Sequence, residues 1–151
     1  MGFELTRRAA MALGALGLTG VAAQAANPTK MTVQLNGQDQ VPPVQTNGTG
    51  TADLTYDPST RKLTWDITYQ NLTSPATMAH IHGPAGPRQN GPVLVWLSKK
   101  GAAPSSPITG SATLTPDQAK MLMAGQTYIN VHSKDHPSGE IRGQITPSQT
   151  S

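Results

Sequence analysis

A period-two alternation of apolar and polar residues runs through most of this chain and restricts it to a fold built from β-strands. In residues 62–69 the apolar positions are Leu63, Trp65, Ile67 and Tyr69. Successive side chains of a strand point to opposite faces, so this segment buries one face and leaves the other in water. An antiparallel sheet allows that arrangement, whereas a parallel sheet is normally covered on both faces.

Eight segments carry this strand pattern, and turns rich in glycine and proline separate them. They are residues 31–36, 50–56, 62–69, 77–82, 93–97, 109–114, 127–132 and 140–145. A helix signal interrupts them, because Thr115 and Gln118 form a capping box, Pro116 suits the first helical position and Gly125 suits the end. We expect an all-β fold, a Greek-key antiparallel sandwich or flattened barrel of about eight strands with one short helix.

The largest side chains complete this picture of the core. Met121 and Leu122 are expected to pack from the helix onto the sheet, and Trp65 and Trp96 are expected inside it. Two alternatives remain open for these residues. A tryptophan can line a surface that binds a sugar or another ligand, and Met121 can belong to a metal site.

The first 25 residues have the composition of an export signal. Arg7 and Arg8 precede a short apolar run that ends in Ala23-Gln24-Ala25, an A-x-A cleavage site, and adjacent arginines are typical of twin-arginine signals. The run is shorter than a membrane-spanning helix. We expect a twin-arginine-like signal at residues 1–25 and a single domain with a short polar tail at residues 26–151. The mature protein would lie in the periplasm or be secreted, without a stable membrane anchor.

Composition excludes several functional classes. The chain contains no cysteine, which excludes thiolate zinc sites and cysteine nucleophiles. The formal net charge is only +3, and the chain lacks the basic clusters with interleaved aromatic residues that bind nucleic acids. We therefore expect no nucleic-acid partner, and the sequence identifies no catalytic residue.

The histidines form two clusters that are far apart in the chain. His80 and His82 lie two positions apart on an expected strand and share one face, while His132 and His136 form the second cluster. Neutral imidazole binds copper and zinc, and several imidazoles without thiolates or clustered carboxylates suit copper(II). If the strands converge, the rings can reach one ion at about 2 Å. The sequence thus predicts a metal site, with copper preferred over zinc.

The neighbours of the histidines allow two interpretations. A metal-bound histidine needs a partner for its second ring nitrogen, and Asp135, Glu140 or a backbone carbonyl can supply it. In the alternative interpretation the histidines only shape turns, and Glu140 forms a surface ion pair with Arg142. Both interpretations place His132 on one strand face with Tyr128 and Asn130.

Several short phrases of the sequence carry a family resemblance. They are LNGQDQVPPV at 35–44, GTGTA at 48–52, AHIHGPAG at 79–86, GPV at 91–93, GSATLT at 110–115, YINVH at 128–132 and HPSGEIRGQ at 136–144. In this order they resemble the CHRD domain, a family named after the animal protein chordin and common in exported bacterial proteins. The resemblance spans residues 30–145 and implies a single CHRD domain.

A fainter resemblance concerns the histidines alone. Copper–zinc superoxide dismutases are Greek-key barrels whose copper ligands include a His-x-His pair and a later Val-His, and His80-Ile81-His82 and Val131-His132 are similar. The resemblance implies His80, His82 and His132 as copper ligands, with His136 as a fourth. The chain departs from the dismutases because it lacks their cysteine pair and histidine-rich zinc loop, and because Arg142 does not clearly match the spacing of their guiding arginine.

Three functions follow from these observations. The main expectation is an exported CHRD-domain protein with a copper site, acting in metal binding or as a redox centre. The first alternative is a metal-free module that binds a protein or a glycan outside the cytoplasm. The second alternative is a copper oxidoreductase similar to superoxide dismutase, which requires a coordination position open to substrate.

Overall fold

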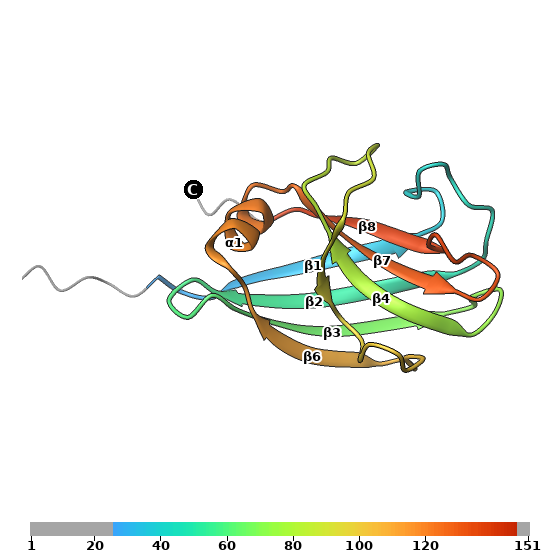
Figure 1. Cartoon of the computed structure of the whole chain (residues 1–151), viewed down its shortest axis with the longest axis horizontal. Coiled ribbons are helices and arrows are strands. Elements are labelled where there is room, and N and C mark those ends of the chain that lie inside the picture. Colours follow the sequence, from blue (N-terminus) through green and yellow to red (C-terminus); the bar gives the residue numbers. More distant parts are fainter. Residues whose placement is uncertain (1–25, 148–151) are drawn as a thin grey trace, which may run out of the picture.

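A computed structural model describes residues 26–147 of the chain. The expected export signal at residues 1–25 and the last four residues, 148–151, lie outside the described residues. The elements are β1 Thr29–Asn36, β2 Thr49–Asp57, β3 Lys62–Gln70, β4 Ala76–His82, β5 Val93–Trp96, β6 Ile108–Thr113, α1 Pro116–Met123, β7 Thr127–Ser133 and β8 Ile141–Ile145 (Figure 1). All eight expected strands and the helix are confirmed, with small differences at their ends.

The eight strands form one antiparallel sheet in the order β5–β4–β7–β8–β1–β2–β3–β6. Strands β1, β2 and β3 follow one another as a meander, whereas β7 returns beside β4 and β6 returns beside β3. In Figure 1 the sheet curls back on itself, so that β7 and β8 lie on one side of the molecule and β2, β3 and β6 on the other. The result is a nearly closed barrel, and the expected fold class is confirmed.

The core lies between the two halves of this flattened barrel. Strand β3 buries Leu63, Trp65 and Ile67 and exposes Asp66 and Thr68, as the alternation predicts. The opposite half contributes small and β-branched side chains, which are Ala79, Ile81, Ile129, Val131, Ile141 and Ile145. Burial of one face of each strand therefore determines which residues point away from the core.

The two tryptophans differ in position. Trp65 is buried, and its Nε1 donates a hydrogen bond to the carbonyl of Leu97 at 3.1 Å, which ties β3 to the segment after β5. Trp96 is 39% exposed, so the expectation that it lies in the core is wrong. Strand β5 is an edge of the sheet, and Trp96 is paired with His80 there, so its ring lies at the rim.

Helix α1 closes one end of the barrel between β6 and β7 (Figure 1). Thr115 caps it, and both hydrogen bonds of the capping box with Gln118 are formed. Leu122 is buried in the core cluster and Met121 is partly buried, which agrees with the expected packing. Among the described residues, no helix is long and apolar enough to cross a membrane.

Candidate metal centre

The outer face of β4, β7 and β8 is polar, yet it is buried. Every residue of β7 is buried, and its Tyr128, Asn130 and His132 alternate with side chains of the core. In Figure 1 the loops after β1 and β4 rise on the side of β7 and β8. Side chains of this face bond to those loops: Asn130 accepts from Gln40 at 2.8 Å, and Gln144 donates to the carbonyl of Ala85 at 2.9 Å. The loops therefore cover a polar layer outside the core.

Strands β4 and β7 bring three histidines together within this layer. His80 and His82 are two residues apart on β4, and Asn130 of β7 lies directly opposite His80, so His132 is diagonal to it. One ring nitrogen of each of the three histidines lies within 4.8 Å of the others. The side chains of His80, His82 and His132 are only 3%, 8% and 6% exposed. We call these three residues the histidine triad.

Backbone carbonyls orient two rings of the triad. The Nδ1 atom of His82 is 2.9 Å from the carbonyl oxygen of Gly91, and Nδ1 of His132 is 2.9 Å from that of Pro137. A carbonyl oxygen only accepts, so each Nδ1 carries the hydrogen and each Nε2 is left with a lone pair. The sequence allowed Asp135, Glu140 or a backbone carbonyl as the partner of the second ring nitrogen. For His82 and His132 the partner is a backbone carbonyl.

His80 completes the triad from the other side. Its Nδ1 lies 3.2 Å from Nε2 of His132. Two nitrogens that each bind one tetrahedral ion at about 2 Å are themselves about 3.3 Å apart, so this spacing suits a shared ion as well as an N–H···N hydrogen bond. The buried Nε2 atoms of His80 and His82 have no hydrogen-bond partner among the described residues. Unpaired buried polar atoms are unusual and indicate a bound ion or water.

Burial keeps the triad neutral. It lowers the pKa of His80 to about 4, assisted by the neighbouring His132 and His82. Burial also lowers the pKa of His82 and of His132, although the hydrogen bonds to Gly91 and Pro137 act in the opposite direction. Because only the neutral imidazole has a lone pair for a metal ion, all three rings are ready to bind one at neutral pH.

His136, the fourth expected ligand, lies in the turn after β7 and outside the triad. It is partly buried, its backbone N–H donates to the hydroxyl of Ser133 at 3.2 Å, and its carbonyl accepts from Gly139 at 3.0 Å. The same turn supplies the Pro137 carbonyl that orients His132. Its role as a fourth ligand stays a prediction.

Tyr128 and Arg142 form a stack beside the triad. The Tyr128 ring is parallel to His82, with an interplanar angle of 6° and 5.0 Å between ring centres. The Arg142 guanidinium lies over the Tyr128 ring, 3.5 Å from its centre, and donates to the carbonyls of Gly86 and Gln89 at 3.0 and 2.8 Å. The alternation of β7 placed Tyr128 and His132 on one face, but no sequence signal pointed to this stack.

Glu140 and Arg142 do not form the surface ion pair considered from the sequence. Both are buried, and Glu140 accepts hydrogen bonds from the Thr46 hydroxyl at 2.6 Å and the Thr73 backbone N–H at 2.8 Å. Burial alone would raise the pKa of Glu140, but hydrogen bonds from Ser133, Thr46 and Thr73 outweigh it and lower the pKa. Glu140 therefore ties three segments together as a carboxylate.

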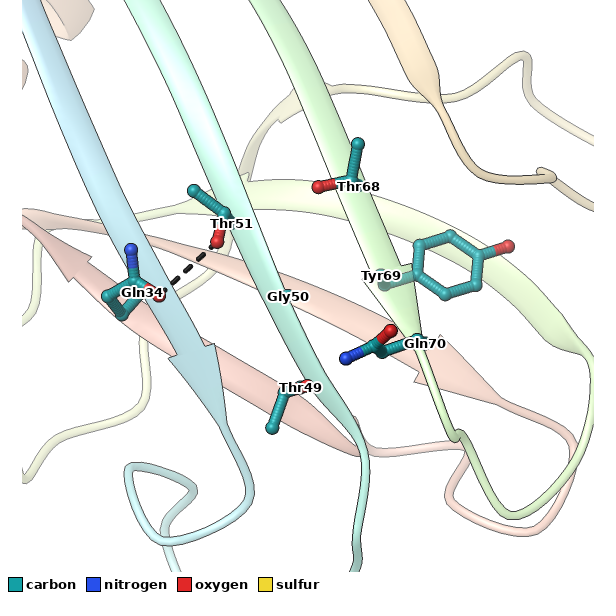
Figure 2. Close-up of a pocket in the computed structure, with 7 residues that line it drawn as sticks. All are labelled: Gln34, Thr49, Gly50, Thr51, Thr68, Tyr69 and Gln70. Atoms are coloured by element: carbon teal, nitrogen blue, oxygen red, sulfur yellow. Dashed lines mark hydrogen bonds between the residues drawn. The ribbon is translucent and has the colours of Figure 1, made fainter.

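A separate groove of about 360 Å³ lies on the outer face of β1, β2 and β3. It is lined by Gln34, Thr49, Gly50, Thr51, Thr68, Tyr69 and Gln70 (Figure 2). Thr51 donates to Gln34 at 3.2 Å, and the Tyr69 hydroxyl donates to the carbonyl of Pro104 at 2.9 Å. The lining offers hydroxyl and amide groups for hydrogen bonding, and none of its side chains is a carboxylate or an imidazole.

Comparison with known proteins identifies one family. The model of the CHRD domain matches residues 31–145, which include the histidine triad and most of the barrel. No curated protein and no solved structure matches the chain. The CHRD resemblance of the sequence is therefore confirmed, whereas the comparisons lend no support to the resemblance to superoxide dismutases.

Proposed function

The chain belongs to the CHRD domain family, and we propose that it is an exported member that binds copper in its histidine triad. One observation supports this most directly: three neutral, nearly buried imidazoles converge, and the buried Nε2 of His82 has no hydrogen-bond partner among the described residues. One ion held by Nδ1 of His80 and by Nε2 of His82 and His132 would occupy that lone pair. Export by the signal at residues 1–25, into the periplasm or out of the cell, is part of the proposal.

The donor set favours copper over zinc. The triad offers imidazole nitrogens alone, and the chain has no thiolate to add. Divalent copper binds such nitrogen sites more tightly than zinc does. His80, His82 and His132 would hold the ion, the Gly91 and Pro137 carbonyls would keep two of the rings oriented, and His136 is the proposed fourth ligand. Bound copper would supply a one-electron redox couple, which suits either metal handling or a redox centre.

The decisive experiment measures copper and zinc in the purified protein after exposure to equal amounts of both ions and desalting. We expect about one copper per chain, and loss of that copper in His82→Ala and His132→Ala, since each variant removes a ligand. Lys134→Ala, an exposed residue next to the triad in sequence, is the matched control and should retain copper. Full copper retention by both histidine variants would refute the proposal.

The same measurement tests the fourth ligand. If His136 moves onto a bound ion, His136→Ala should retain less copper than the Lys134→Ala control, although more than a variant of the triad. Equal retention by His136→Ala and Lys134→Ala would remove His136 from the site.

A metal-free module that binds a glycan or a protein is the second candidate. The groove of Figure 2 favours it, because hydroxyl and amide groups along three strands can pair with the hydroxyl groups of a sugar. This candidate predicts glycan binding by metal-free protein, and loss of that binding in Thr68→Arg, which would fill the groove. A dismutase-like enzyme has less support, because a substrate must reach the ion and the triad is nearly inaccessible.

A further inference from the structure

Met78 lies next to two members of the triad. It precedes His80 by two residues on β4, and the register of β4 and β7 places it directly opposite His132. The irregularity in this pairing lies before Met78, so Met78, His80 and His82 alternate regularly with the core residues Ala79 and Ile81. Side chains directly opposite each other across antiparallel strands have Cβ atoms about 5 Å apart. The Met78 side chain therefore starts beside the His80–His132 contact.

The chemistry of methionine suits this position. Its side chain is unbranched and flexible, and its thioether sulfur is a soft donor that favours copper(I). Of the other methionines that the structure describes, Met31 is buried in the core, and Met121 and Met123 lie on α1. Met78 is only partly buried, and it is the one that is paired with a residue of the triad.

We propose that the Sδ atom of Met78 is a ligand of the copper ion held by the histidine triad. This inference rests on the proposed function and extends it to copper(I). Three imidazoles alone suit copper(II), whereas an added thioether stabilises copper(I). The site then holds copper in both states, with Met78 as the residue that determines copper(I) affinity. A role in packing alone would be fulfilled equally well by leucine, which has a similar volume.

The test compares wild type, Met78→Leu and Met123→Leu, the last being an exposed methionine of α1 that serves as the matched control. Each protein is loaded anaerobically with copper(I), and X-ray absorption at the copper edge reports whether sulfur is bound. Competition with a coloured copper(I) chelator gives the affinity. We expect a copper–sulfur shell in wild type and Met123→Leu and nitrogen ligands alone in Met78→Leu. That variant should bind copper(I) roughly tenfold more weakly, with copper(II) affinity changed by less than about twofold.

The outcomes separate this inference from the proposed function. Wild type that binds copper(I) with nitrogen ligands only would overturn the role of Met78 and leave copper binding in place, and this result needs no variant. Equal copper(I) affinity of wild type and Met78→Leu would overturn it as well. Wild type that binds copper in neither oxidation state would overturn the proposed function, and the ligand role of Met78 with it.

Discussion

His80 illustrates how position changes the chemistry of a single residue. Its ring is nearly inaccessible, one nitrogen faces His132, and the other has no hydrogen-bond partner among the described residues. Burial and the two neighbouring histidines lower its pKa from 6.5 to about 4. A histidine that stays neutral at mildly acidic pH can keep a metal ion under conditions that protonate an exposed one.

The lowered pKa of His80 makes the stability of the metal-free protein depend on pH. Between pH 4 and 6.5 the unfolded chain binds more protons at this residue than the folded protein does, so the free energy of unfolding rises with pH. We expect the melting temperature of metal-free protein to fall as the pH is lowered through this window. His80→Asn should weaken that dependence. Thermal melts at a series of pH values measure the pH dependence of the melting temperature. Identical profiles for wild type and His80→Asn would contradict the assignment of this dependence to His80.

Among the elements, the β4–β7 pair and the loops over it act together. The strand pair places the triad, while Arg142 of β8 bonds to the loop after β4 and Glu140 bonds to Thr46 and Thr73 in two other loops. Glu140 is fully buried, and its charged carboxylate accepts the hydrogen bonds from Thr46 and Thr73. Charge-assisted hydrogen bonds are stronger than neutral ones, so the two loops that carry Thr46 and Thr73 depend on this carboxylate.

Replacement of Glu140 by glutamine should therefore destabilise the fold. The amide keeps the size of the side chain but loses the charge, and its NH₂ group would face donors instead of acceptors. We expect the free energy of unfolding to fall by about 1–3 kcal/mol, measured by urea denaturation. Asp66→Asn, on the exposed face of β3, is the control and should change it by less than about 0.5 kcal/mol. Equal losses in both variants would show that Glu140 has no special role.

For the whole molecule, the closure of the barrel decides which distant segments meet. The chain crosses between the two halves of the sheet, and only the folded barrel sets β4 beside β7. The hydrogen bond from Trp65 to Leu97 joins β3, the neighbour of the edge strand β6, to the segment that follows the other edge strand, β5. The histidine triad is thus a property of the assembled fold, and a ligand of the triad should bind the folded state alone.

Copper should consequently raise the melting temperature of the protein. A ligand that binds only the folded state adds about 2.7 kcal/mol to the free energy of unfolding when its free concentration is 100 times Kd. We expect a shift of the melting temperature that grows with copper concentration in wild type and is lost in His132→Ala. Calorimetry with and without copper measures this shift. An equal shift in the variant would indicate that copper binds elsewhere.

Local patterns in the sequence were sufficient for the secondary structure and for much of the core. The alternation around Trp65 and the capping box at Thr115 depend on neighbours within a few residues, so β3 and α1 could be predicted with only small errors at their ends. The spacing of His80 and His82 is local in the same sense. For these features the physical cause lies within one strand or one helical turn.

The tertiary structure decided everything that depends on register and on position in the sheet. The exposure of Trp96 follows from β5 being an edge strand, and the separate partners of Glu140 and Arg142 follow from where three loops meet the barrel. Strand register and loop position also determine which carbonyls orient the triad and which residue is paired with Met78. Strand pairing joins residues that are distant in the chain, and local periodicity contains no information about which strands become neighbours.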